Sequence, residues 1–312
     1  MPGSLDARLV GDVARRLGAG GYSYTDRQLW YAVCAELEPP ELTRGLAQIV
    51  AGVVLIAVGV VFGIYATVFV AVLVPIGMVV AGMGVQNRRL ERNRPAARAL
   101  MVSYDAFVRE TVAPMRERHG NRLEGLLPAD GLPEPEDAPS SHPEGVELLV
   151  CDRGETAALL SALAPPQVPT WRALVETDAP IFIGRARVFA IHDADPRGCA
   201  LPLRLAEAGA RDVIDAGLRP AQLSGHRLQI IEGAPYVVSA ELSRLLTPDE
   251  VVWLAMGRRA ELAILSPRQI AEALPRVIAA SPTAPPGAAP RAVKLAGASL
   301  LSEAVEETPV RA

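Results

Sequence analysis

Residues 187–198 read RVFAIHDADPRG and decide the fold of the largest part of the chain. The segment begins with an apolar run that lacks turn-forming residues, which is typical of a strand buried on both faces. Asp193 and Asp195 follow this run in alternate positions. Their side chains can therefore point toward one place just beyond the end of the strand.

The segments around this strand predict a small α/β domain over residues 146–280. Residues 146–151 (VELLVC) form another apolar run, and Asp152 follows it. Strands that alternate with helices favour a small parallel sheet with flanking helices. The further elements that we expect are strands at 212–214 and 228–231, and helices at 155–163, 199–209, 248–256 (capped by Thr247) and 267–278 (capped by Ser266).

Three acidic residues are candidate metal ligands in this domain. Ligands of α/β sheets bind beyond the carboxyl ends of the strands, where Asp152, Asp193 and Asp195 are expected. Carboxylate oxygens suit Mg²⁺, so a magnesium site is predicted here. The alternative for a DxD string is a turn or a helix cap.

Residues 1–43 predict a short helical unit of helix-turn-helix type. Apolar residues recur at helical spacing in residues 5–18, and four residues rich in glycine (18–21) interrupt the pattern. Thr25 can cap a second helix, and Pro39 with Pro40 ends it. Little room is left for a wing, so the unit is partial at best.

Residues 46–85 contain no charged residue. One helix of this length would run about 60 Å, twice the roughly 30 Å of a bilayer core. We therefore expect a transmembrane hairpin of helices 46–63 and 67–85, a two-pass membrane protein with both termini cytoplasmic, and the lipid bilayer as a partner. The alternative is a hydrophobic hairpin inside a large soluble core.

The remaining segments have distinct compositions. Residues 86–125 are rich in arginine and predict a basic juxtamembrane helix, which could face DNA or anionic lipid headgroups. Residues 126–145 predict a Pro-rich linker, and residues 281–312 a disordered tail with one short helix at most. The net charge of −4 argues against a strongly basic nucleic-acid coat. The three cysteines match no metal motif and fit a reducing compartment.

Several segments together resemble a known family. VFAIHDADPRG and VELLVCDRGETAALLSAL resemble the DxD segment and the first strand, acid and helix of a TOPRIM domain. DAGLRPAQL (215–223), LTPDE (246–250) and RRAELAIL (258–265) then follow in the order seen in the A subunit of topoisomerase VI and its meiotic double-strand-break relatives. RQLWY (27–31) is similar to that family's tyrosine motif.

This resemblance implies a reaction mechanism. Tyr31 would be the nucleophile that attacks DNA, with Arg27 beside it as a further catalytic candidate, and Mg²⁺ would help the leaving oxygen. It also implies a homodimer, since the family joins the tyrosine of one subunit to the metal site of the other. Arg197 and Arg219 are candidate phosphate contacts, and an unknown second protein subunit is a further partner. The family has glutamate where this chain has Asp152, so the metal geometry would differ.

Each of these residues also has a simpler structural interpretation. Tyr31 is also compatible with a core or interface aromatic on an amphipathic helix. His192 could act as a base beside the acids or be held by structural hydrogen bonds. Arg197 could pair with Asp195, and Arg219 with Asp215.

Three functions stay open from the sequence. The leading hypothesis is Mg²⁺-dependent DNA strand cleavage by a membrane-anchored, topoisomerase-like protein. The second is a non-catalytic membrane scaffold or interaction protein that retains a degenerate TOPRIM fold. The third is a membrane-bound, metal-dependent phosphohydrolase, which would not need Tyr31.

Overall fold

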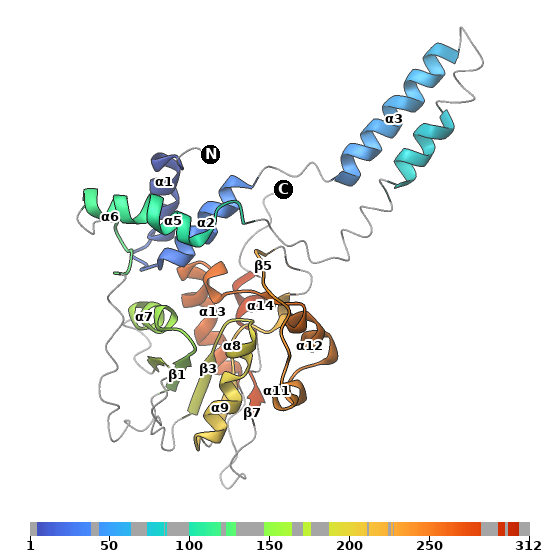
Figure 1. Ribbon diagram of the computed structural model, residues 1–312. Helices are drawn as coiled ribbons and strands as arrows, with labels where there is room; N and C mark the ends of the chain where they lie inside the picture. Colours follow the sequence, from blue (N-terminus) through green and yellow to red (C-terminus); the bar gives the residue numbers. More distant parts are fainter. Residues whose placement is uncertain are drawn as a thin grey trace. The chain divides into compact units, whose positions relative to one another are not determined.

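The computed structural model describes residues 5–38, 44–63, 74–83, 85, 100–119, 123–128, 147–163, 171–175, 187–210, 212–223, 226, 228–281, 293–296 and 299–305 (Figure 1). The chain divides into two compact units. The larger contains residues 1–37, 99–224 and 229–312, and the smaller contains residues 38–98 and 225–228.

A parallel sheet organises the larger unit. Its strands lie in the order β2-β1-β3-β4-β7. Their bounds are Glu147–Cys151 (β1), Trp171–Val175 (β2), Arg187–Ile191 (β3), Asp212–Asp215 (β4) and Val293–Leu295 (β7). The side chains from Leu148 to Cys151 and from Val188 to Ile191 are fully buried. Such continuous apolar strands form because helices cover both faces of a parallel sheet.

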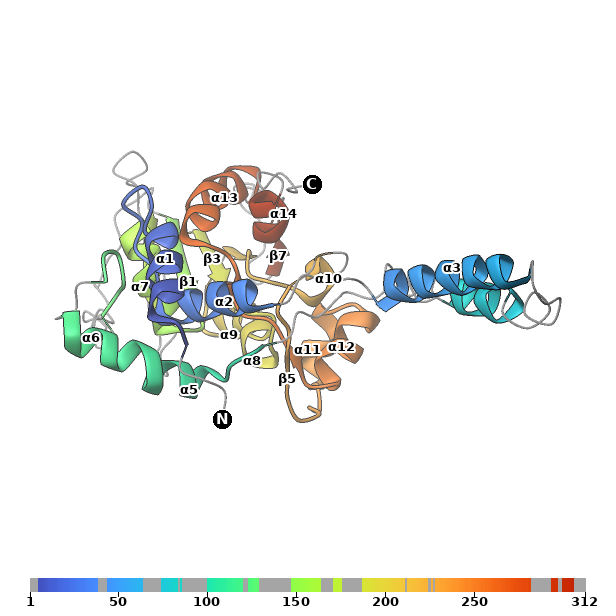
Figure 2. The same ribbon diagram turned by 90° about the horizontal axis from the view of Figure 1, so that it is seen from above.

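Helices flank the sheet on both sides (Figures 1 and 2). α7 and α13 pack together on one face, with α7 against β1 and β2, and α9 packs against β4 and β7. The helices are α7 (Gly154–Leu163), α8 (Pro196–Cys199), α9 (Leu201–Glu207), α10 (Pro220–Leu223), α11 (Ala240–Leu245), α12 (Pro248–Ala255), the 3-10 helix η2 (Leu262–Ile264), α13 (Pro267–Ala280) and α14 (Leu300–Val305). A short antiparallel pair, β5 (Ile231–Glu232) and β6 (Arg258–Arg259), precedes η2.

Two predicted caps are present and set where α12 and α13 begin. The Thr247 hydroxyl accepts from the amide of Glu250, whose carboxylate accepts from the amide of Thr247. Ser266 and Gln269 form the same reciprocal pair at α13. Each such capping box satisfies two backbone donors and typically contributes about 1 kcal/mol.

The N-terminal helices form a cluster with an apolar core of their own. The cluster contains α1 (Ala7–Leu17), α2 (Asp26–Leu37), α5 (Tyr104–Phe107), the π-helix η1 (Val108–Val112) and α6 (Ala113–His119). Leu29, Val33 and Phe107 are fully buried in it. The Trp30 indole donates to the Val102 carbonyl at 2.8 Å, which ties α2 to the segment before α5. Figure 1 shows α2 near one end of the sheet.

The smaller unit contains two helical segments, α3 (Arg44–Gly63) and residues 74–83. They approach closely at Gly52 and Gly77, where an added Cβ on Gly52 would lie 2.7 Å from the Gly77 carbonyl oxygen. The turn of the hairpin was predicted at residues 63–67; Gly63 ends α3, and residues 64–67 lie outside the described residues.

The predicted transmembrane hairpin is wrong. Within the described part of the chain, no helix is both long and apolar enough to cross a bilayer. This finding also overturns the predicted two-pass membrane localisation.

The fold class is corrected accordingly. The architecture is a mixed helical and sheet structure with a small parallel sheet, and the described residues contain no helix that could form the membrane-spanning hairpin that we expected. Residues 86–99 of the predicted basic helix and 129–145 of the predicted linker lie outside the described residues. Residues 281–312, predicted as a tail, contain the edge strand β7 and the helix α14, which packs against α13.

Candidate functional site

The strand register brings the predicted acids together. Cys151 at the end of β1 lies level with Ile191 at the end of β3. Asp152 and the pair Asp193 and Asp195 therefore emerge at the same edge of the sheet. The backbone amide of Asp193 donates to Asp152 Oδ2 at 3.1 Å. The expected meeting of these acids at the carboxyl ends of the strands is thus observed.

Arg153 lies at the centre of this group of acids. Its Nε contacts Asp193 Oδ2 directly. Its Nη2 lies 3.2 Å from Glu261 Oε1 and 3.7 Å from Asp195 Oδ2. One guanidinium group therefore bridges three carboxylates, which come from two different parts of the chain.

Arg27 of α2 joins the same group from the helical cluster. Its Nη1 donates to both oxygens of Glu261, at 2.9 and 3.1 Å, and its Nε lies 3.1 Å from Glu155 Oε2. Its guanidinium stacks on the Tyr104 ring, 4.3 Å from the centroid. We call the five carboxylates and two arginines the carboxylate cluster; its members are Arg27, Asp152, Arg153, Glu155, Asp193, Asp195 and Glu261.

The carboxylate cluster contains more acidic than basic groups, with five carboxyl groups and two guanidinium groups. Burial, and then the charge of Asp152, raise the pKa of Asp193. Burial also raises the pKa of Asp152. Asp193 Oδ1 accepts from the Leu262 amide at 2.6 Å, whereas Asp152 Oδ1 is buried without a hydrogen-bond partner among the described residues.

The residues as arranged do not fit a magnesium site. Among the described residues, no group of three or more carboxylates, imidazoles or thiols has an arrangement that could hold a metal ion. Among the described residues of the site, Asp152 Oδ1 favours a cation, because it is buried without a hydrogen-bond partner. The guanidinium of Arg153 contacts the other two predicted ligands, Asp193 and Asp195, which a metal would need.

Asp195 also caps a helix, as the alternative interpretation of the DxD string expects. Its Oδ1 accepts from the Gly198 amide at 2.7 Å, at the start of α8. Arg197 is exposed on that helix, and its carbonyl accepts from Arg204 at 3.1 Å. The structure does not bring Arg197 into the carboxylate cluster.

His192 and Arg219 are held by other partners. His192 is fully buried, with Nε2 2.9 Å from Asp215 Oδ1 and Nδ1 2.8 Å from the Asp193 carbonyl. Burial would lower its pKa, but the charge of Asp215 outweighs this and raises the pKa of His192 to about 9. Arg219 pairs with Glu250 at 2.6 Å and lies 3.9 Å from Asp215. His192 therefore has the structural hydrogen bonds of its simpler interpretation, whereas the close partner of Arg219 is Glu250, which was not predicted, with Asp215 farther away.

Tyr31 lies beside the carboxylate cluster but is only 2% exposed. Its ring packs against Trp30, 4.5 Å between centroids, and its carbonyl accepts from Gln229 at 3.2 Å. Burial, and then the charges of Glu261 and Asp193, raise the pKa of Tyr31 well above its ordinary value. A phenol in this environment is a poor nucleophile, because its reactive anion is disfavoured.

Sequence reasoning missed Arg153, Glu155 and Glu261. Arg153 directly follows the first predicted ligand, and Glu261 lies in the RRAELAIL segment that carried part of the resemblance. Adjacency in the sequence gave no clue to its role, because Arg153 contacts Asp193, Asp195 and Glu261, which are all distant from it in the chain. The partnership with Glu261 is tertiary and depends on how η2 packs against α2.

Comparisons with known proteins identify no family and no function for this chain. No protein-family model, curated protein or solved structure matches the chain. The function must therefore be argued from the site itself.

Gly198 gives a direct test of how tightly this edge of the sheet is packed. A Cβ at residue 198 would contact the Asp193 carbonyl oxygen and lie 2.9 Å from Asp152 Oδ2. We expect Gly198→Ala to lower the free energy of unfolding by about 2 kcal/mol, because backbone must move to admit the methyl group. Urea denaturation measures this. Gly11→Ala is the control, since nothing lies within 4 Å of its Cβ position. Equal stability of the two variants would contradict the close packing.

Proposed function

We propose that this chain is a non-catalytic interaction protein on a TOPRIM-like fold, in which an arginine has taken the place of a metal ion. The observation that carries the proposal is the guanidinium of Arg153, which bridges Asp193, Asp195 and Glu261. A guanidinium is permanently charged and cannot supply the Lewis acidity of a metal.

The surroundings of Tyr31 support the same proposal. Its side chain is almost fully buried, and its raised pKa keeps the phenol protonated. A nucleophile of DNA must reach a backbone phosphorus and must lose its proton. The packing of Tyr31 against Trp30 serves the core of the helical cluster instead.

Metal-dependent DNA cleavage through Tyr31 is the second candidate. One observation favours it: α2 brings Tyr31 close enough to Asp193 and Glu261 for their charges to act on its phenol, within one chain and not across the homodimer that the resemblance implies. Activity would require Tyr31 to become exposed and Arg153 to leave the acids.

A DNA-cleavage assay separates these two candidates. Supercoiled plasmid is incubated with the full chain and Mg²⁺ or Mn²⁺, and covalent protein–DNA adducts are trapped with detergent. We expect no nicked or linear product and no adduct from the parent chain. Cleavage by the parent chain that is abolished in Tyr31→Phe would overturn the non-catalytic proposal.

Tyr31→Phe also has an expected effect on stability. The substitution keeps the aromatic packing against Trp30 and removes only a hydroxyl group. We expect the free energy of unfolding to change by less than about 1 kcal/mol, the usual scale of one buried hydrogen-bonding group. Tyr31→Ala is the contrast, with an expected loss of about 4 kcal/mol from the lost aromatic volume. Urea denaturation measures the stability of both variants. If Tyr31→Ala were as stable as the parent, the assignment of Tyr31 to the apolar core of the helical cluster would be contradicted.

A further inference from the structure

Within the larger unit, a seam joins the helical cluster to the sheet and its flanking helices. At one side of the seam α2 packs against η2, and Ala263 and Ile264 of η2 contact the apolar core of the helical cluster. Gln28 Nε2 of α2 also donates to the buried Leu265 carbonyl at 2.9 Å. This side of the seam is therefore closely packed and combines apolar contacts with a hydrogen bond.

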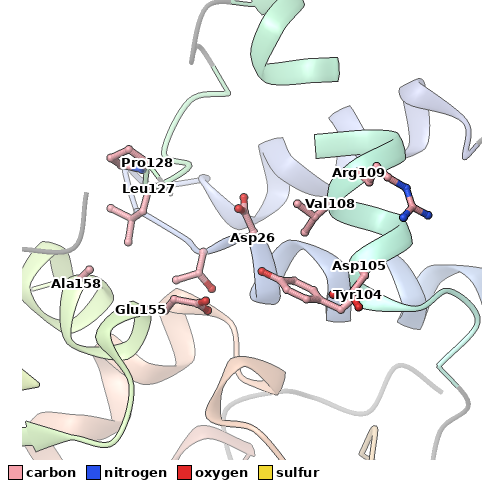
Figure 3. Close-up of a pocket in the computed structure, with 10 residues that line it drawn as sticks. Asp26, Tyr104, Asp105, Val108, Arg109, Leu127, Pro128, Glu155 and Ala158 are labelled. Carbon is pink, nitrogen blue, oxygen red and sulfur yellow. The ribbon is translucent and has the colours of Figure 1, made fainter. Parts of the chain in front are cut away.

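The other side of the seam, next to α7, is loosely packed. A cavity of about 330 Å³ lies there between α7 and the helices α5 and η1 (Figure 3). In Figure 3, Glu155 and Ala158 of α7 lie on one side of the cavity, and Val108 and Arg109 of η1 lie on the other. Because the interior of a protein domain is normally close-packed, the two parts are held less firmly here than at η2.

Acidic side chains face this cavity from both parts. Asp26 and Asp105 line it from the helical cluster, and Glu155 lines it from α7. Burial raises the pKa of Asp26, the charge of Arg116 lowers it, and the charge of Glu155 raises it further. The carboxylates of Asp26 and Glu155 therefore repel each other across the cavity, which favours separation of its walls.

Arg27 joins the two parts against this repulsion. Its guanidinium stacks on the Tyr104 ring of the helical cluster, while its Nε lies 3.1 Å from Glu155 of α7 and its Nη1 donates to Glu261, just before η2. The side chain of Glu155 is 42% exposed. Water and salt can therefore reach the pair of Arg27 with Glu155 and weaken it.

We propose that the helical cluster is a hinged cover over the carboxylate cluster, with η2 as the hinge and Arg27 as the latch. When Arg27 releases Glu155, the cover turns about the packed contact at η2 and opens the side next to α7. The carboxylate cluster then becomes accessible from that side. The cover controls when this cluster can meet another molecule, and it operates whether or not the cluster is catalytic.

Thiol labelling of the full chain tests the cover. Ala158 is only 8% exposed at the wall of the cavity, so the thiol introduced by Ala158→Cys has room but little access to solvent. Native Cys34 and Cys151 are fully buried, the first in the helical cluster and the second in β1. Because they react only when their own part of the chain unfolds, they distinguish opening from unfolding.

Removal of the latch should accelerate labelling of the introduced thiol. In the Ala158→Cys background, we expect Arg27→Gln to raise the labelling rate about tenfold, the scale of one hydrogen bond to a charged group. Salt at about 1 M, where the Debye length is about 3 Å, should raise the rate severalfold when Arg27 is present. Arg16→Gln is the matched control, because it removes an exposed ion pair with Glu36 of α2 that lies within the helical cluster.

The outcomes separate a moving cover from a rigid or an unfolding protein. Faster labelling in Arg27→Gln and in salt, with Arg16→Gln unchanged and both native cysteines protected, supports the proposal. An unchanged rate in Arg27→Gln or in salt overturns it, as does an equal increase in Arg16→Gln. Labelling of Cys34 or Cys151 as fast as the introduced thiol also overturns it, because the chain would then unfold instead of opening at the seam.

Discussion

Replacement of Arg153 by alanine is expected to lower the free energy of unfolding by about 3 kcal/mol at neutral pH, the scale found when one partner of a buried ion pair is removed. The reason is the charge balance of the carboxylate cluster. Without Arg153, the acids Asp193, Asp195 and Glu261 would retain only Arg27 as a cationic neighbour within the cluster. Urea denaturation measures the loss.

The same variant should respond to divalent cations. With the guanidinium removed, the three carboxylates repel one another, and Mg²⁺ or Mn²⁺ in the millimolar range should restore part of the lost stability by binding the folded state. Arg15→Ala is the control, because the ion pair that Arg15 forms with Asp12 among the described residues is exposed. If Arg153→Ala were no less stable than Arg15→Ala, Arg153 would not be the group that neutralises the acids.

The second large effect concerns Glu250, which is 1% exposed on α12. Its carboxylate accepts from Arg219 at 3.0 and 2.6 Å and from the amides of Thr247 and Ala221 at 2.8 and 3.3 Å. Glu250→Gln replaces an acceptor by an amide donor opposite the guanidinium. We expect a loss of about 3 kcal/mol in the free energy of unfolding, since a buried charge is left without its partner.

The loss should depend on pH. Burial would raise the pKa of Glu250, but the hydrogen bonds from Arg219 and Thr247 outweigh it, so the pKa is lowered from its ordinary 4.5. A lowered pKa means that this stabilisation is fully present above pH 4.5 and is lost as the pH falls through the folded-state value. The difference between parent and Glu250→Gln should therefore shrink in acid. The exposed Glu232→Gln is the control, and a pH-independent difference would contradict the ion-pair explanation.

The central strands and the helix caps could be predicted because they depend on local patterns. β1 and β3 are continuous apolar runs, and Thr247 and Ser266 begin helices through hydrogen bonds three residues away. β2 and β7 were missed. They lie at the two edges of the sheet, and β7 is only three residues long, so pairing with β1 and β4 determines them more than their own sequence does.

The site could be predicted only in part, for a related reason. Strand ends identify Asp152, Asp193 and Asp195, since the register of parallel strands follows from the apolar runs. Arg27 and Glu261, which complete the carboxylate cluster, pair with each other across 234 residues of chain, and no local pattern links them. The prediction of a transmembrane hairpin was wrong because it inferred the environment of residues 46–85 from their composition alone.

The central claim is that Arg153 occupies the place of a cation. Calorimetric titration of the full chain with Mg²⁺ and Mn²⁺ tests it most directly, with Arg153→Ala and the double variant Asp193→Asn, Asp195→Asn alongside. We predict no binding by the parent at millimolar metal, binding by folded Arg153→Ala, and none by the double variant. Metal binding by the parent that the double variant abolishes would contradict the claim and would favour a metal-dependent activity instead.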